Sequence, residues 1–189
     1  MKRKSLVRGT LVLCTAFVLA ACGGNEEESK SKEEMDHSQM DHAQMDHSSS
    51  GEVPEGLADA KKPTYPVGGE AMINADHMGG MDGATAKITG AFDTTVYMVT
   101  YNPTTGGEPV EDHKWVIHEE LEDAGEEPFT SGEEVLLNAD HMDGMEGAAA
   151  TIDSAEQTTV YMVSYKDTET GEEVTHHKWV TESELSPVE

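Results

Sequence analysis

Val96-Tyr97-Met98-Val99-Thr100-Tyr101 recurs later in the chain as Val160-Tyr161-Met162-Val163-Ser164-Tyr165. β-Branched and aromatic residues fit a pleated, half-buried surface, so both stretches predict β-strands. Glycine-containing turns follow at 104–107 and 168–171, where glycine supplies the positive φ that a hairpin turn requires. The chain is therefore expected to be mainly β.

These strands belong to an internal duplication. Residues 65–121 align with residues 129–185 without a gap, and more than half of the aligned positions are identical. The short strands in each copy predict a small barrel of the SH3-like kind, so we expect two tandem barrels, repeat 1 at 65–124 and repeat 2 at 129–189. The strands predicted for repeat 1 lie at 70–75, 84–91, 96–101 and 110–117, and one helical turn is predicted near the end of each repeat.

The first residues have the composition of an export signal. Basic residues precede an apolar run that is too short to span a membrane as a helix. The run ends at Leu19-Ala20-Ala21-Cys22, which resembles the lipobox of bacterial lipoproteins. The resemblance implies a signal peptide at residues 1–21, lipidation of Cys22 and a protein anchored on the extracellular face of the cell membrane.

Residues 22–64 are poor in large apolar side chains, so burial cannot offset their ordering entropy and a disordered tail is predicted. The tail contains a Met-Asp-His triplet three times. Thioether and imidazole donors together favour copper, with Cu(I) selecting methionine and Cu(II) selecting imidazole and carboxylate. The alternative is a low-complexity spacer that happens to contain these residues. The predicted ligands are Met35, His37, Met40, His42, Met45 and His47, with Asp36, Asp41 and Asp46 as weaker candidates.

Composition excludes several classes of function. The formal net charge is −26 and no arginine follows the signal peptide, which excludes a nucleic-acid partner. Removal of Cys14 with the signal and lipidation of Cys22 would leave no free thiol and no disulfide. No nucleophile motif, phosphate-binding loop or metalloprotease helix is present, so the chain is predicted not to be an enzyme.

A second methionine and histidine motif lies inside the repeats. Asn-Ala-Asp-His-Met-x-Gly-Met occurs once in each copy, on a predicted turn, and presents an imidazole and two thioethers. Methionine is also a good filler of core gaps, so packing is the alternative. The candidate ligands in this motif are His77, Met78 and Met81 in repeat 1, and His141, Met142 and Met145 in repeat 2.

His-Lys-Trp-Val also occurs in both copies, and its histidines, His113 and His177, are weaker candidates for metal ligands. Strand alternation would place histidine and tryptophan on the same face. The alternative is therefore that Trp115 and Trp179 fill the barrel cores with these histidines packed beside them.

The lipobox, the Met/His/Asp tail, and the tandem blocks Asn-Ala-Asp-His-Met-x-Gly-Met, Thr-Val-Tyr-Met-Val and His-Lys-Trp-Val together resemble the YdhK-type lipoproteins of Gram-positive bacteria. The resemblance covers nearly the whole chain and implies an exported two-repeat domain. One branch of that family, the staphylococcal CopL-like lipoproteins, is associated with copper efflux and binds copper at the cell surface. The resemblance does not imply which residues bind the metal.

The sequence thus predicts a membrane-anchored lipoprotein that sequesters or buffers copper through methionine and histidine. A copper exporter is a candidate partner. The alternative is a non-enzymatic module of two SH3-like barrels that binds cell-wall polymer or peptide, with the tail as a spacer.

Overall fold

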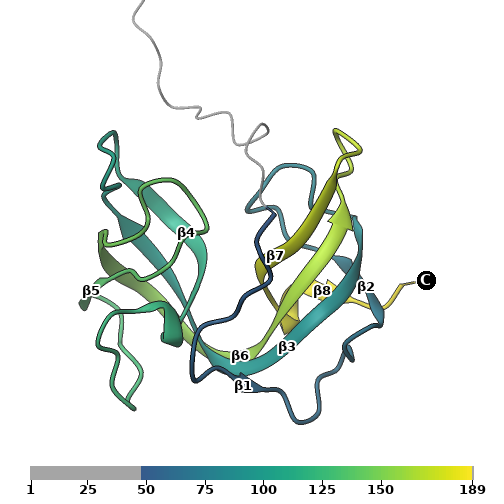
Figure 1. Ribbon diagram of the computed structural model, residues 1–189, viewed down its shortest axis with the longest axis horizontal. Helices are drawn as coiled ribbons and strands as arrows, with labels where there is room; N and C mark the ends of the chain where they lie inside the picture. Colours follow the sequence, from purple (N-terminus) through teal and green to yellow (C-terminus); the bar gives the residue numbers. More distant parts are fainter. Residues whose placement is uncertain (1–47, 189) are drawn as a thin grey trace, which may run out of the picture. The chain divides into compact units, whose positions relative to one another are not determined.

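The computed structural model describes residues 48–188 of the 189-residue chain (Figure 1). The predicted signal peptide, Cys22 and the three Met-Asp-His triplets lie outside the described residues. Within residues 48–188, no helix is both long and apolar enough to cross a membrane.

The described chain is almost entirely β, which confirms the predicted class. Every strand pairing is antiparallel, and the sheet order is β5-β6-β3-β2-β8, with β1 and β4 also paired to β3 and β7 paired to β6. A single 3-10 turn closes each repeat, as expected. The strands are β1 Ala58–Asp59, β2 Glu70–Ile73, β3 Thr85–Tyr101, β4 Val110–Ile117, β5 Glu134–Leu136, β6 Ala149–Lys166, β7 Glu173–Thr181 and β8 Leu185–Ser186, and the 3-10 turns are η2 His118–Glu120 and η3 Glu182–Glu184.

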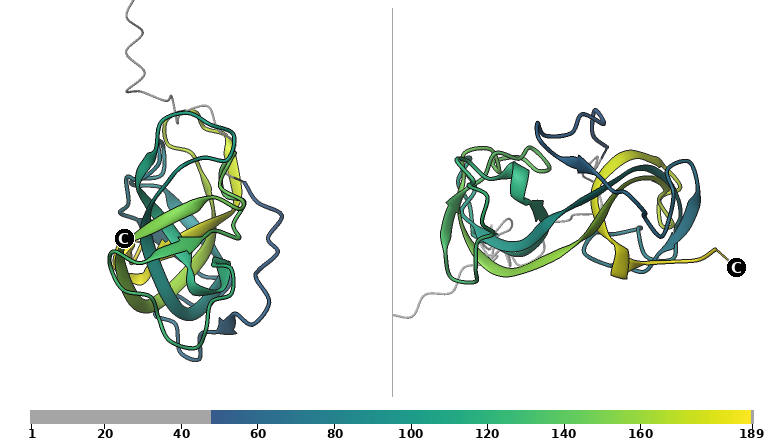
Figure 2. Two further views of the ribbon diagram at one scale, coloured as in Figure 1. Left: turned by 90° about the vertical axis from the view of Figure 1, so that its left-hand side faces the viewer. Right: turned by 90° about the horizontal axis from the view of Figure 1, so that it is seen from below.

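Strands β3 and β6 pair along almost their entire length, from Ala86 opposite Tyr165 to Tyr101 opposite Ala150. Figures 1 and 2 show them as two long ribbons that run side by side. The sequence predicted separate strands at 84–91 and 96–101, and this prediction is wrong. The intervening Phe92-Asp93-Thr94-Thr95 contains no glycine or proline, and phenylalanine and threonine favour an extended backbone. The strand therefore continues where a small barrel would need the chain to turn back.

The predicted SH3-like barrel is not confirmed. The ends of the described sheet path, β5 and β8, pair only with β6 and β2, and the sheet does not close on itself. The structure supports a mainly β, open antiparallel arrangement in which the two repeats share one sheet.

Each repeat contributes one half to each of two hydrophobic cores. The first core combines Ile73 and Ile88 of repeat 1 with Tyr161 and Val180 of repeat 2. The second core combines the second half of repeat 1 with the first half of repeat 2. Its members include Tyr97, Tyr101 and Leu121 from repeat 1, with Leu137, Met145 and Ile152 from repeat 2. Each core is therefore built from one half of each repeat, and the long paired strands β3 and β6, called here the β3–β6 ribbon, run from one core to the other. We call this arrangement an exchange of halves.

A third cluster of buried residues lies on the middle of β3 and β6 and also draws on both repeats. It contains Phe92 and Ile117 from repeat 1 and Val160 and Trp179 from repeat 2. The rings of Phe92 and Trp179 meet edge to face, with their centres 5.8 Å apart. On β3 and β6 this cluster lies between residues of the first core and residues of the second.

Residues 48–64, which the sequence assigned to the tail, pack on the sheet. The Ser49 backbone N–H donates to the Thr175 carbonyl at 3.0 Å, and the Ser49 hydroxyl donates to the His176 carbonyl at 2.6 Å. Leu57 packs against the third cluster and β1 pairs with β3. The ordered part of the chain therefore includes residues that were predicted to belong to the tail. Their backbone groups form hydrogen bonds with β7 and β3, and composition alone does not reveal such bonds.

Candidate metal centre

A bulge in β4 and in β7 sets the direction of each His-Lys-Trp segment. The strand register shifts between the pairs Val99–His113 and Tyr101–Val110, and β7 has the same irregularity against β6. The extra residues, Asp112 and His176, have φ of 52° and 53°. The Lys-Trp peptide bond is cis in both repeats. Bulges commonly re-aim side chains next to functional sites.

The histidines and tryptophans of these segments do not lie together in the two cores, which corrects the sequence interpretation. Trp179 is fully buried in the third cluster, and Trp115 packs against the same cluster. His113 and His177 instead line a cavity. The two weaker candidates from the sequence therefore line a cavity, and the tryptophans of the same segments pack in or against the third cluster.

The cavity has a volume of about 120 Å³ and is lined by side chains from both repeats. Glu111 and Asp112 also border it and are themselves exposed. Its soft-metal donors are His77, Met78 and His113 from repeat 1, with His141, Met142 and His177 from repeat 2. The folded chain thus brings six of the candidate ligands together.

The four imidazoles form two neighbouring pairs. The ring centres of His77 and His177 are 6.2 Å apart, and those of His113 and His141 are 6.3 Å apart. In each pair one ring comes from repeat 1 and the other from repeat 2. An edge-to-face tyrosine supports the strand histidine of each pair. Tyr165 lies 6.0 Å from His177, and Tyr101 lies 5.8 Å from His113, between ring centres.

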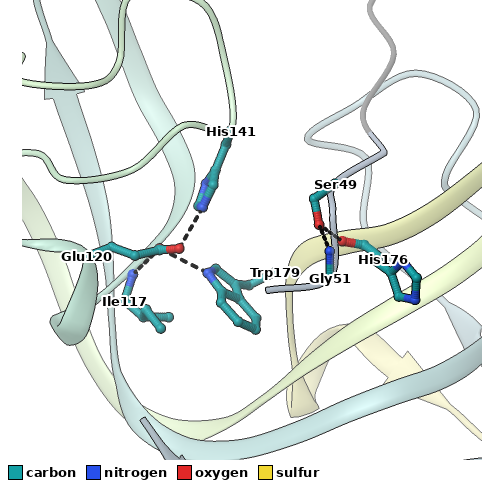
Figure 3. Close-up of polar contacts among 7 residues, drawn as sticks. All are labelled: Ser49, Gly51, Ile117, Glu120, His141, His176 and Trp179. Atoms are coloured by element: carbon teal, nitrogen blue, oxygen red, sulfur yellow. Dashed lines mark hydrogen bonds and ion pairs between the residues drawn. The ribbon is translucent and has the colours of Figure 1, made fainter. Parts of the chain in front are cut away.

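Glu120 ties three elements together beside the cavity (Figure 3). Its carboxylate lies 2.8 Å from His141 Nε2 and accepts hydrogen bonds from Trp179 Nε1 at 3.0 Å and from the Ile117 backbone N–H at 3.2 Å. Burial alone would raise the pKa of Glu120, but the charge and hydrogen bond of His141, with the bonds from Trp179 and Ile117, lower it. An ionised, fully hydrogen-bonded carboxylate therefore stands beside His141.

Glu184 occupies the equivalent position in the other repeat. Its carboxylate lies 3.5 Å from His77 Nδ1 and accepts hydrogen bonds from Trp115 Nε1 and from the Thr181 backbone N–H, both at 2.9 Å. Burial would raise the pKa of Glu184. The ion pair with His77 and the hydrogen bonds from Thr181 and Trp115 outweigh that effect and lower the pKa to about 2.

Each glutamate lies beside one imidazole nitrogen of its histidine, and the other nitrogen of that ring has no hydrogen-bond partner. His77 Nε2 and His141 Nδ1 are buried and have no hydrogen-bond partner, and each of these side chains is only 9% exposed. A carboxylate on one ring nitrogen, with the other nitrogen directed elsewhere, is the arrangement that orients histidine ligands in metal sites. A buried imidazole nitrogen without a partner also carries a desolvation cost that a ligand would offset.

Within residues 48–188, no three histidine, aspartate or glutamate side chains converge on one point with the geometry of a metal site. The candidate donors that line the cavity are two pairs of imidazoles, which suit several transition metals, and two soft thioethers.

The remaining candidates have separate roles. Met81 and Met145 are 0% exposed, belong to the first and second cores and are not among the residues that line the cavity, so the packing interpretation describes them. His118 bonds Tyr97 Oη and the Gly125 carbonyl, both at 2.8 Å. Glu120 and Glu184 were missed from the sequence because acidic residues are so abundant. Their equivalent positions just before the closing leucine of each repeat were the available signal.

Replacing Glu184 by glutamine is expected to remove an acid-sensitive part of the stability. The pKa of Glu184 is about 2 in the folded chain against 4.5 for an unperturbed group. Its ionised form therefore stabilises the fold above about pH 4.5, and this contribution is lost as the pH falls toward 2. The difference in unfolding free energy between the parent and E184Q should shrink over that interval, measured by urea denaturation.

Glu173→Gln is the matched control for E184Q, since Glu173 is an exposed residue at the start of β7. It should show no comparable change with pH. A stability difference between E184Q and the parent that stays constant from neutral pH to pH 2 would contradict the assigned role of Glu184.

Comparisons with known proteins agree with this description. A family model described as "Protein of unknown function (DUF1541)" matches twice, at residues 67–118 and 131–182, which confirms the duplication. The uncharacterized protein YdhK of Bacillus subtilis (strain 168) is 53% identical over 196 residues, covering 98% of this chain and 91% of that protein.

Solved structures of YdhK from Bacillus subtilis are also similar. A crystal structure is 58% identical with a TM-score of 0.75, covering 78% of this chain and all of that chain. A solution structure of the YdhK C-terminal domain is 58% identical with a TM-score of 0.62, covering 65% of this chain and 92% of that one. On the two matches to the family model and the near full-length identity, the chain belongs to the DUF1541 family.

Proposed function

We propose that the protein is a lipid-anchored lipoprotein on the extracellular face of the cell membrane that binds copper and sequesters or buffers it. The observation that carries the proposal is the cavity in which four imidazoles and two thioethers meet. Two of those imidazoles have a buried nitrogen without a hydrogen-bond partner.

The chemistry of the donors selects the metal. Thioethers are ligands for Cu(I), and imidazoles serve both oxidation states of copper. The mature chain would contain no free thiol, so methionine and histidine are the soft donors that remain. The formal net charge of −26 adds a field that concentrates cations near the protein.

The tail and the cavity would have different tasks. Three Met-Asp-His triplets on one segment raise each other's effective concentration, so modest individual affinities combine into efficient capture. The cavity, enclosed by both repeats, would hold the ion away from solvent. An exporter is the candidate recipient, which would give copper tolerance rather than catalysis.

Removal of residues 34–47 is expected to lower the number of Cu(I) ions bound by the purified chain 23–189 without abolishing binding. The deletion removes the three methionines and three histidines of the triplets and leaves the cavity residues in place. Anaerobic titration against a chromophoric Cu(I) chelator measures both stoichiometry and affinity. Deletion of residues 26–33, which contain neither methionine nor histidine, is the control.

Equal stoichiometry and affinity in the parent and in the 34–47 deletion would remove the tail from the mechanism. Absence of copper uptake by the parent at micromolar concentration would overturn the proposal. Copper-independent sedimentation with purified peptidoglycan, together with that absence, would favour the alternative of a wall-binding tandem module of the SH3-like kind.

A further inference from the structure

We propose that a groove beside the second core binds an extended, positively charged peptide segment of another protein. The groove has a volume of about 540 Å³ and is lined by residues of β3, β5 and β6 and of the segment 122–129 that connects the repeats. We call it the β5 groove. It shares no lining residue with the histidine cavity, so its ligand would be independent of the metal.

The floor of the β5 groove is the outward face of the sheet, and several of its side chains are small. Tyr101, Val135 and Ala150 belong to the second core. Their neighbours along each strand therefore point away from that core. These outward residues are Thr100 and Asn102 at the end of β3, Ala149 and Thr151 on β6, and Glu134 and Leu136 on β5. Alanine and threonine leave room above the sheet for a bound chain.

The groove also includes a sheet edge that is only partly paired. Within residues 48–188, β5 pairs with β6 and with no second strand. The Glu122 backbone N–H donates to the Leu136 carbonyl on the other edge at 2.9 Å, but the next residue, Asp123, has a φ of 52° and lies in a turn. Residues two apart on an antiparallel strand present their backbone groups to the same edge, so Glu134 offers its groups there. An open edge of this kind can accept an added strand.

Two apolar side chains border this edge. Leu136 is 45% exposed, which is high for a large apolar residue of a strand. Phe129 is half-buried, and its ring packs edge to face on Tyr97 with the centres 6.3 Å apart. Together they offer a contact for an apolar side chain of the added strand, whose alternate residues would face the groove.

The charge of the lining selects a cationic ligand. Glu122, Asp123 and Glu134 line the groove and are all exposed, and no lysine, arginine or histidine is among its lining residues. An anionic partner would be repelled, whereas lysine or arginine side chains of a bound peptide would meet these carboxylates.

The duplication provides an internal comparison, because the equivalent face beside the first core differs in charge. Its edge strand, β2, is paired on its second side by β8. Two lysines and two residues without charge stand where the β5 groove has neutral and acidic residues. The replacements are Lys166 for Asn102, Lys87 for Thr151, Ser186 for Glu122 and Pro187 for Asp123. The proposed site is therefore expected on one side of the molecule only.

The test screens a bead-displayed library of octapeptides against the fluorescently labelled chain 23–189 in the presence of a metal chelator. We expect the retained peptides to be enriched in lysine and arginine, and higher salt should weaken their binding. A resynthesised peptide should shift the backbone amide signals of Glu134, Leu136 and Thr151 in ¹H–¹⁵N spectra. Methylation of alternate peptide nitrogens should abolish binding for one set of positions and not for the other, because an added strand uses every second amide at the shared edge.

Ala149→Arg fills the floor and adds a positive charge, so it should lower the affinity by about tenfold or more. Thr85→Arg is the matched control, because Thr85 is the equivalent exposed residue of repeat 1 and lies outside the groove. It should leave the affinity unchanged. Backbone spectra of each variant check that the fold is retained.

The double variant Glu122→Gln, Glu134→Gln should lower the affinity by about three- to tenfold, since each exposed ion pair contributes modestly. Its control is Glu70→Gln, the equivalent of Glu134 in repeat 1, which is also exposed. The salt dependence of binding should be weaker in the double variant than in the control.

The proposal would be overturned if the library yielded no binder, or binders without basic residues. Equal affinities in Ala149→Arg and Thr85→Arg, or amide shifts away from β5 and β6, would place the peptide elsewhere and overturn it too. If soluble chitin oligosaccharides shift the amides of the groove and no peptide does, its ligand is a glycan instead. None of these results bears on the copper titrations, so the proposed function stands or fails separately.

Discussion

Residues 65–124, expressed alone, are expected to be unfolded as a monomer, although they contain one complete sequence repeat. The first core joins Ile73 and Ile88 of this repeat to Tyr161 and Val180 of the other, so the isolated repeat would leave its apolar residues uncovered. The long strand β3 would also lose β6, its partner along almost its whole length. Circular dichroism and amide NMR at low concentration should therefore show a disordered chain.

Mixing this fragment with residues 125–189 at equal concentration is expected to restore the strand signal, because the two fragments together supply both cores. Analytical ultracentrifugation would report a one-to-one complex. At high concentration the fragment 65–124 could pair β3 with β3 of a second copy, so the monomer test belongs at the lowest usable concentration. A well-dispersed NMR spectrum from a monomeric fragment would contradict the exchange of halves.

Replacing Trp179 by alanine is expected to lower the free energy of unfolding by about 3–5 kcal/mol, the usual cost of truncating a buried large aromatic residue. Trp179 is 0% exposed in the third cluster, where it packs with residues of both repeats. Its indole also donates to the buried Glu120 carboxylate, so the substitution removes one hydrogen bond from a charged group. Urea denaturation measures the loss.

Trp115→Ala is the matched control, because Trp115 occupies the equivalent position in repeat 1 and donates to Glu184 in the same way. Trp115 is only partly buried against the third cluster, so its loss should cost clearly less. Equal losses of unfolding free energy for the two substitutions would contradict the greater contribution assigned to Trp179 through its full burial in the third cluster.

Two of the candidate ligands predicted from the sequence, His77 and Met78, line the cavity. The sequence indicated them because the same histidine and methionine motif occurs in both repeats. The same pattern also selected Met81, which is a core residue. Sequence spacing shows which donors lie on one turn, but the direction of each side chain depends on packing against the other repeat.

Residues of the cavity that come from other elements were harder to predict. His177 was only a weaker candidate ligand, because strand alternation offered packing beside the core as the alternative, and the bulge with its positive φ at His176 changed that direction. Glu184 meets His77 across more than half of the sequence, and nothing local to either residue specifies the contact. Such partners follow only from the arrangement of the whole chain.

The sequence by itself determined the β class, the duplication and the donor chemistry, because these depend on local propensity, self-similarity and composition. The tertiary structure decided that β3 runs on through Phe92-Asp93-Thr94-Thr95 and pairs with β6, so that the repeats exchange halves. Local propensity favours an extended backbone there in either arrangement, and only the availability of a long partner strand selects between them. That exchange also brings His77 to His177 and His113 to His141.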